Sequence, residues 1–359
     1  MNFLRYLVAM HALALGSTAT AAEFCVTTAA QFQQALMMAG NNGQADTIKI
    51  ETGTYASTGG AVAFAYNTGE NFSLIVQGGW VSNPPVLCAR QLPVPTATIL
   101  SGSDVRQVLK ITGATGTIGG LSLSNLTLRD GMTSQTGAGL EIGGGGGFTG
   151  NVLVYRVIVE RNVSTQFGGG MKVYTEGIAN IRNNLFLLNR CTVSNCAISA
   201  TVNATDPTAV RAFFGNNTIV GNQCTSGSSC TATGARFGGS ARAVFYNNVF
   251  AANSNGDIDL LSLGSGSVDL YYNNYVSLTG TAPSSTVGNI AFANPQFVDL
   301  LGEDFRPTLG SPMRNAGTDQ FVLQATDLAG EPRINEGRVD IGAYENSDRI
   351  FADAFELFE

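Results

Sequence analysis

The chain has 359 residues, of which 44% are hydrophobic and 13% charged, and it carries a formal net charge of −7. A chain of this length and hydrophobicity can bury a core and is not intrinsically disordered, and its acidity argues against nucleic acids and anionic membrane surfaces as partners. The single histidine, His11, lies in a leader that we expect to be removed, which excludes Ser-His-Asp and Cys-His catalysis and zinc binding by histidine.

The first 22 residues are typical of a secretory signal peptide. A short basic start, Met1–Arg5, precedes an apolar stretch, Tyr6–Leu15, and small residues follow at Ala19–Ala22. No later apolar run is long enough to cross a bilayer, so we expect no transmembrane segment. We therefore expect a monomer that is secreted or extracellular and is either released or associated with the cell surface.

A repeat of about 30 residues runs through the middle of the chain. Each unit contains short runs in which apolar and polar residues alternate, separated by Gly, Asn and Ser, and none has the period of an amphipathic helix. The repeat therefore predicts coils built from β-strands. The units begin at Asn125, Val157, Asn184, Asn217, Asn248 and Asn274.

Asparagine recurs at two positions of the aligned units. Its amide both donates and accepts hydrogen bonds, and its backbone tolerates the left-handed conformation of a tight turn. Because stacked strands lie about 4.8 Å apart, each amide can reach the next. We interpret both columns as structural ladders and not as catalytic groups. One column consists of the unit starts, and the other of Asp130, Asn162, Asn189, Asn222 and Asn253.

Six cysteines fit the oxidising compartment that a secreted protein enters. They are Cys25, Cys88, Cys191, Cys196, Cys224 and Cys230. Two pairings are open for the last four: Cys191–Cys196 with Cys224–Cys230 inside single coils, or Cys191–Cys224 with Cys196–Cys230 across neighbouring coils. We favour the pairs inside the coils. The two remaining cysteines would then tie the N-terminal segment to the first coils.

Segments outside the repeat resemble a known family. They include a helix expected over Thr28–Ala39, the motif Gly78–Trp80, and a C-terminal block with Asn294–Asp299, Asp327–Gly330 and Asp340–Glu345. Together with the coils they resemble the right-handed parallel β-helix, the pectin-lyase-like fold, and within it secreted bacterial proteins of the choice-of-anchor Q type. The resemblance implies an all-β solenoid of about seven or eight coils with an N-terminal helical cap and a C-terminal capping segment.

The resemblance divides the chain into five parts. The last of them is similar to a short tail on some proteobacterial exported proteins, with Ala354 in place of a glycine, and is either a sorting signal or a frayed terminus. The parts are a signal peptide over 1–22, an N-terminal cap and entry to the coil over 23–60, coils over 61–300, a C-terminal capping segment over 301–346 and an acidic tail over 347–359.

Relatives with this fold include polysaccharide lyases, which implies an enzymatic hypothesis. Such a lyase removes a proton next to a uronate carboxylate with an Arg or Lys base, usually beside a Ca²⁺ ion held by acidic oxygens. Lys172 or Arg236 would be the base, on a face that also carries Glu141. The alternative, which we favour, is that these charges only keep an exposed sheet soluble. The candidate Ca²⁺ ligands are Asp257, Asp259 and Asp269.

A second outward column suits the binding of a sugar polymer. It lies two residues before the first asparagine column, and its aromatic rings would stack on sugars while Arg182 pairs with a uronate or sulfate group. The alternative is that the tyrosines pack under a loop or among themselves. The candidate carbohydrate-binding residues are Tyr155, Arg182, Tyr246 and Tyr272.

These observations lead to two hypotheses of function. The one we favour is a non-catalytic secreted or cell-surface protein that needs no cofactor and binds polysaccharide or acts in adhesion or surface structure. The other is a polysaccharide lyase that cleaves acidic glycans by β-elimination, with Ca²⁺ as its cofactor.

Overall fold

The computed structural model describes residues 21–114, 119–143, 148–226, 230, 232–335 and 337–346. The expected signal peptide, apart from its last two residues, and the expected acidic tail lie outside the described residues. Among the helices that the described ranges contain, none is long and apolar enough to cross a membrane.

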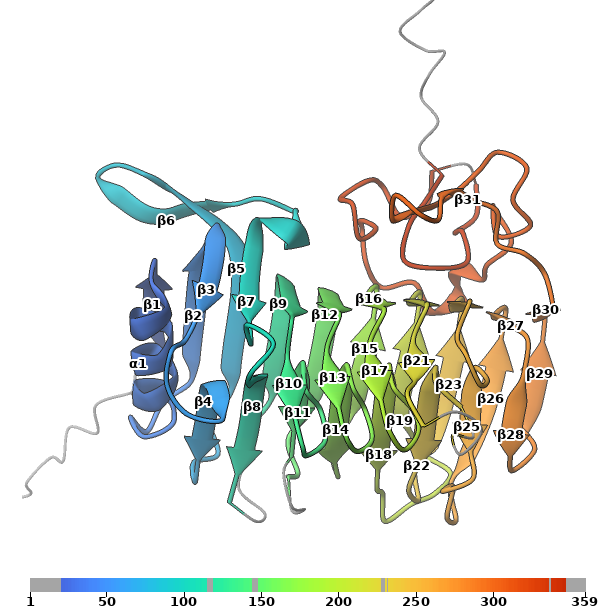
Figure 1. Ribbon diagram of the computed structural model, residues 1–359, viewed down its shortest axis with the longest axis horizontal. Coiled ribbons are helices and arrows are strands. Elements are labelled where there is room, and N and C mark those ends of the chain that lie inside the picture. Colours follow the sequence, from blue (N-terminus) through green and yellow to red (C-terminus); the bar gives the residue numbers. More distant parts are fainter. Residues whose placement is uncertain are drawn as a thin grey trace, which may run out of the picture.

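Most strands pair in parallel with strands of the preceding and following coils and belong to three sheets that run along one axis (Figure 1). This all-β arrangement fits a parallel β-helix-like solenoid. One of these sheets has eight strands among the described residues. In spatial order it contains β4 (Val62–Thr68), β8 (Gln107–Gly113), β11 (Leu140–Ile142), β14 (Met171–Thr175), β18 (Ile198–Val202), β22 (Ala235–Gly238), β25 (Ile258–Leu260) and β28 (Leu278–Gly280).

The largest sheet bends along its length into two limbs. The first limb contains β1 (Ala22–Val26), β2 (Asp46–Glu51), β5 (Leu74–Asn83), the starts of β9 (Leu121–Arg129) and β12 (Val152–Glu160), and then β15 (Ala179–Arg182), β19 (Val210–Gly215), β23 (Arg242–Tyr246), β26 (Ser267–Tyr271) and β29 (Ser285–Val287). The second limb contains β3 (Gly53–Ala56), β7 (Thr98–Ser101), the ends of β9 and β12, and then β16 (Leu185–Leu187), β20 (Thr218–Val220), β24 (Val249–Ala251), β27 (Asn274–Tyr275) and β30 (Ile290–Ala291).

Shorter elements complete the coils and their flanks. β6 (Val86–Gln91) pairs antiparallel with β5 and forms a hairpin, and one-turn 3-10 helices occur at Pro95–Ala97 and Asp319–Phe321. The four-stranded sheet contains β10 (Met132–Thr133), β13 (Val163–Ser164), β17 (Arg190–Cys191) and β21 (Gln223–Cys224), and a separate hairpin contains β31 (Phe297–Asp299) and β32 (Asp304–Pro307).

A column of residues with positive φ forms the corner between the two limbs. Asparagine suits this corner because its backbone adopts the left-handed region more readily than that of most residues. The corner residues are Asn125, Arg156, Asn183, Asn216 and Asn247, with φ between 52° and 58°. The next corner residue is Tyr272, with a φ of 55°, so Arg156 and Tyr272 are the exceptions in an otherwise asparagine column.

The predicted asparagine ladders are present. Directly after the corner, the amide of Asn184 donates to Oδ1 of Asn217 over 3.1 Å, and that of Asn217 donates to Oδ1 of Asn248 over 2.9 Å. The first ladder continues through Asn273 and not through the expected Asn274. The corner residue Asn125 lies outside it. The second ladder consists of Asn162, Asn189, Asn222 and Asn253, and not of the expected Asp130, because Gly131 is the residue in register with Asn162.

The predicted N-terminal helix is α1 (Ala29–Ala39). Thr28 is its N-cap, because its side-chain oxygen accepts a hydrogen bond from the N–H of Gln31 over 3.2 Å. The helix packs against β4, β1 and β2 at the N-terminal end of the sheets (Figure 1). Its residue Phe32 is fully buried, with its ring centroid 4.9 Å from that of Phe64.

The C-terminal segment lies along the side of the solenoid, which differs from the expected cap across its end (Figure 1). Phe305 and Leu328 pack onto the outward side chains of the second limb, among them Ile158, Leu185 and Val220. The corner explains this placement, because its asparagine side chains point outward and bond to the segment: Asn183 donates to the carbonyl of Thr326, and Asn247 donates to that of Thr318 over 2.9 Å.

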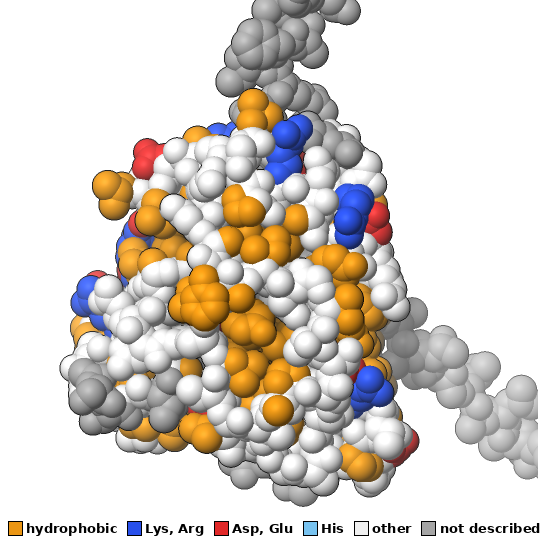
Figure 2. Space-filling view, turned by 90° about the vertical axis from the view of Figure 1, so that its right-hand side faces the viewer, with side chains coloured by type: hydrophobic (Ala, Val, Ile, Leu, Met, Phe, Trp, Pro, Cys, Tyr) orange, Lys and Arg blue, Asp and Glu red, His pale blue; other side chains and the backbone are white. Residues whose placement is uncertain are grey.

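The far end of the solenoid is formed by β28, β29 and β30, each paired on one side only among the described strands. Figure 2 looks onto this end and shows hydrophobic side chains gathered in its middle. Val276, Val287 and Phe292 are exposed hydrophobic residues of these last coils.

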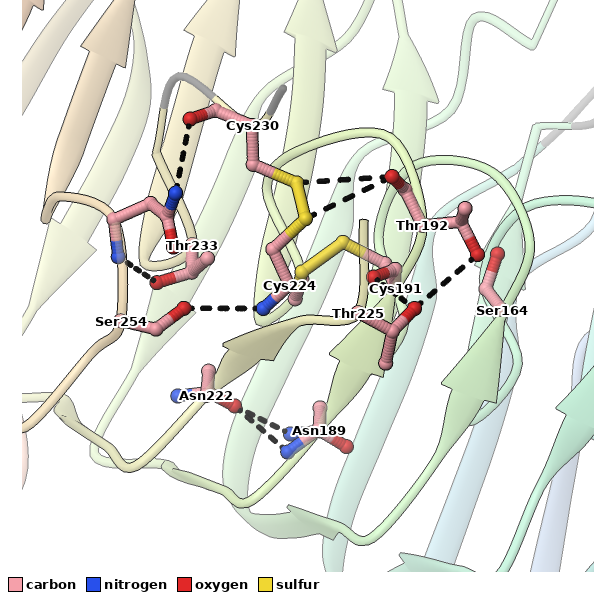
Figure 3. Close-up of a disulfide and its surroundings, with 12 residues drawn as sticks. Ser164, Asn189, Cys191, Thr192, Asn222, Cys224, Thr225, Cys230, Thr233 and Ser254 are labelled. Carbon is pink, nitrogen blue, oxygen red and sulfur yellow. Dashed lines mark hydrogen bonds between the residues drawn. A yellow bond between two sulfur atoms is a disulfide. The ribbon is translucent and has the colours of Figure 1, made fainter. Parts of the chain in front are cut away.

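All six cysteines form disulfides, and the favoured pairing is confirmed. Cys191 and Cys224 are in-register neighbours on β17 and β21, yet Cys191 bonds to Cys196 and Cys224 to Cys230 inside their own coils. Figure 3 shows the Cys224–Cys230 bridge near the Asn189–Asn222 step of the second ladder. The third disulfide joins β1 to β6, at Cys25 and Cys88.

Candidate functional site

The charged residues of the eight-stranded sheet lie in register, on neighbouring strands. Lys172 on β14 is opposite Glu141 on one side and Ser199 on the other, and Arg236 on β22 is opposite Ser199 and Asp259. The two candidate bases are thus separated by a whole strand, or by about 10 Å along the axis.

Each of these two bases already has protein partners. Nζ of Lys172 lies 3.8 Å from Oε1 of Glu141, whose other oxygen lies 3.3 Å from Lys110. Arg236 donates to the hydroxyl oxygens of Ser262 and Ser199 over 3.2 and 3.3 Å. The column therefore forms a chain of local polar contacts along the sheet and does not bring Lys172 and Arg236 to one point.

The three candidate Ca²⁺ ligands are buried and separately engaged. Asp257 accepts hydrogen bonds from Asn253 over 3.1 Å and from the N–H of Val276 over 2.7 Å. Asp269 accepts two from Arg242, over 2.6 and 2.9 Å, and Asp259 accepts one from the N–H of Leu261.

The three aspartates do not assemble into one ligand set. In the described ranges, the only group of three close metal-ligand side chains is Cys25, Glu51 and Cys88, and its two sulfur atoms are joined in a disulfide. A thiolate is the form of cysteine that binds metal, so this group is not a metal site while the disulfide is intact.

The second predicted column exists, with one change at its far end. Register pairs connect Tyr155, Arg182, Gly215 and Tyr246, but the next partner is Tyr271 and not Tyr272. Tyr272 has a φ of 55° and occupies the position after the strand. The column thus shifts by one residue where the coil turns.

Tyr246 does not present the expected open face to a sugar. Only 1% of its surface is exposed, because Phe321 of the C-terminal segment covers it, with ring centroids 5.1 Å apart. Its ring extends over Gly215, where an added Cβ would lie 1.9 Å from the ring carbon Cζ. The expected sugar-stacking platform of Tyr246 and Tyr272 is therefore wrong. Tyr246 packs under the C-terminal segment, as in the alternative that the tyrosines pack under a loop.

Tyr155 and Arg182 remain at the surface and lie together. The guanidinium carbon of Arg182 lies 5.6 Å from the ring centroid of Tyr155, within the range of a cation–π contact. Burial raises the pKa of the Tyr246 phenol to about 12, and the nearby positive charge of Arg182 opposes that rise. The cation thus lies against one tyrosine of its own column.

A depression follows the outer face of the first limb at this point. A cavity of about 360 Å³ is lined by residues of β5, β9, β12 and β15, among them Ile75, Asn180 and Arg182. A second cavity of about 320 Å³ is lined by Tyr155 and residues of the β5–β6 hairpin. Both share Ser122 and Leu153, so they are parts of one depression, which we call the first-limb groove.

Arg156, which lines this groove, joins the segment after the β5–β6 hairpin to the C-terminal segment, a role that our sequence reasoning missed. Its Nη2 donates to the carbonyl of Pro93, beyond the hairpin, and its Nη1 donates to Oγ1 of Thr326 in the C-terminal segment over 2.6 Å. A third bond reaches the carbonyl of Leu328. The one available signal was the break in the corner column, where arginine replaces asparagine.

Two comparisons of the chain with known proteins found no match. No family model matches the chain, and no curated protein matches it.

Proposed function

We propose that this chain is a secreted or cell-surface right-handed parallel β-helix protein of the choice-of-anchor Q type that binds polysaccharide in the first-limb groove without cleaving it. The leader over 1–22 would direct its export and be removed. Three disulfides and the chain's resemblance to secreted proteins support this location.

The observation that carries the proposal is the course of the groove. It crosses β5, β9, β12 and β15, which are successive strands of the first limb, and therefore runs along the solenoid axis. A polymer can lie along such a groove and make the same kind of contact at several coils. Tyr155 offers a ring, and Gln77, Ser122 and Asn180 offer polar groups for sugar hydroxyls.

The lyase hypothesis receives less support from the geometry. A β-elimination site needs a base next to a cation that stabilises the developing negative charge. Lys172 is engaged by Glu141, and the three candidate aspartates are engaged by separate local partners. We therefore do not put it forward as a second function.

Affinity electrophoresis tests the proposal. The purified mature protein is run through gels containing pectate, alginate, chondroitin sulfate or dextran, and we expect at least one polymer to retard it. Tyr155→Ala should abolish the retardation. Tyr174→Ala is the matched control, because Tyr174 is a partly buried tyrosine of β14 in the other large sheet. Mobility unchanged in every gel, or equal effects of the two substitutions, would refute binding in this groove.

A further inference from the structure

We infer that the first-limb groove contains an anion subsite at Arg182, which selects acidic glycans through their carboxylate or sulfate groups. This inference rests on the proposed function and specifies its ligand class. It follows from the surroundings of one side chain.

No acidic side chain of the described residues neutralises Arg182. Across the described residues, no hydrogen bond or ion pair is found for its guanidinium, and its Nε and Nη1 atoms are buried without a partner. Three other partly exposed arginines differ in this respect. Arg129, Arg161 and Arg242 each lie within 2.6 Å of a carboxylate oxygen.

The groove itself contributes no negative charge. Apart from Arg182 and Arg156, the side chains that line its two cavities are uncharged, and none is an aspartate or glutamate. The two Nη atoms of Arg156 already donate to Pro93, Thr326 and Leu328. The net electrostatic character of the groove is therefore positive, on a protein whose formal charge is −7.

An aromatic ring, and not an acid, lies beside the Arg182 cation among the described residues. This ring is Tyr155 on β12, while the ring of Tyr246 from β23 covers Gly215, the residue in register with Arg182 on the next strand. Removing a charge from water without a counter-charge is costly, and that cost is relieved when an anion binds. A guanidinium is planar and suits the oxygens of a carboxylate or a sulfate.

A neighbouring acceptor completes the subsite. Oδ1 of Asn180 is also buried and has no hydrogen-bond partner, and Asn180 lines the same cavity two residues before Arg182 on β15. A sugar hydroxyl can donate to this oxygen while the acidic group of that sugar or of its neighbour meets Arg182. Arg182 and Asn180 thus match an acidic sugar better than a free inorganic anion.

Titration calorimetry with defined polymers tests the inference. The ligands are pectate for carboxylate, chondroitin sulfate for sulfate with carboxylate, and carboxyl-reduced pectate and dextran as neutral polymers. We expect an acidic polymer to bind. Arg182→Gln should weaken the affinity for that polymer at least tenfold, while Arg182→Lys should lose less affinity. The matched control is Arg236→Gln, an arginine of the eight-stranded sheet, which should leave the affinity unchanged. Comparing pectate with chondroitin sulfate identifies which acidic group is preferred.

A second measurement separates failure of the subsite from failure of the proposed function. The Nε–H resonance of Arg182, assigned by its loss in Arg182→Lys, should shift in NMR spectra when galacturonate or sulfate is added. If the wild type binds polymers but neither this resonance nor the affinity of Arg182→Gln changes, the anion subsite is refuted and glycan binding stands. If galacturonate shifts the resonance but no polymer binds, the subsite stands and polymer binding fails.

Discussion

Nη2 of Arg156 lies 2.5 Å from the carbonyl oxygen of Pro93 and so joins the corner of the solenoid to the segment that follows the β5–β6 hairpin. The same guanidinium also bonds to Thr326 and Leu328. One side chain, 5% exposed, thereby connects three parts of the chain that are distant in sequence.

Replacing Arg156 with alanine should destabilise the protein by about 3 kcal/mol, because three acceptors lose their donor at once. Urea unfolding followed by circular dichroism measures the change. Arg90→Ala, at an exposed residue of the same hairpin, should change the free energy of unfolding by less than about 0.5 kcal/mol. Equal effects of the two substitutions would show that the Arg156 bridge contributes nothing specific.

Replacing Asn217 with alanine should interrupt the first ladder. Asn217 is fully buried, donates to Asn248 and to the carbonyl of Ile181, and accepts from Asn184. Its loss leaves buried polar groups without partners, so we expect a cost of about 3 kcal/mol in thermal or urea unfolding. Asn41→Ala is the control. It removes an exposed amide that bonds only to the end of α1, and it should hardly change the free energy of unfolding.

Replacing Gly215 with alanine should disturb the anion subsite through the neighbouring strand. The new methyl group would overlap the ring of Tyr246 and push it away from Arg182. We expect a loss of about 1–3 kcal/mol in stability and weaker binding of acidic polymer. Gly59→Ala is the control, since an added Cβ there meets nothing within 4 Å. Unchanged polymer affinity in Gly215→Ala would argue against a role of Tyr246 in positioning Arg182.

The C-terminal segment contains a buried ion pair that should make stability depend on pH. Nε of Arg333 lies 3.2 Å from Oε1 of Glu345, and both side chains are almost fully buried. Burial raises the pKa of Glu345 from 4.5 to about 8, Arg333 opposes the rise, and the charges of Asp340 and Asp327 add to it. Burial also raises the pKa of Asp327.

Because these pKa values are higher in the folded protein, the folded state binds protons more tightly than the unfolded chain. The resulting stability is fully present below about pH 4.5 and is lost as the pH rises through about 8. Melting temperatures measured from pH 5 to pH 9 should therefore fall. Glu345→Gln removes the titrating group, and a pH dependence identical to that of the wild type would contradict the assignment to Glu345.

The repeat made the strand coils and the asparagine ladders predictable, because both depend on contacts between equivalent residues of adjacent coils. Asn184, Asn217 and Asn248 recur at matching positions and bond to one another as expected. The error at Asn274, where Asn273 carries the ladder, arose because the last units are shorter and their alignment slips by one residue. Tyr272 was misplaced for the same reason.

The candidate site was only partly predictable. Tyr155 and Arg182 share a column, and their proximity follows from strand register alone. The burial of Tyr246 could not be foreseen, because Phe321 is 75 residues away and no repeat relates them. The role of Arg156 likewise depends on Pro93 and Leu328, which meet only in the folded chain.

What the sequence determined by itself is therefore the part of the protein governed by local and periodic rules, namely strand alternation and the αL tolerance of asparagine. Only the tertiary structure decided where the C-terminal segment packs, and with it which half of the Tyr155–Tyr246 column is covered and which remains a groove. The physical reason is that this packing joins a non-repeating segment to the coils and depends on the complementarity of side chains such as Phe305, which have no periodic counterpart.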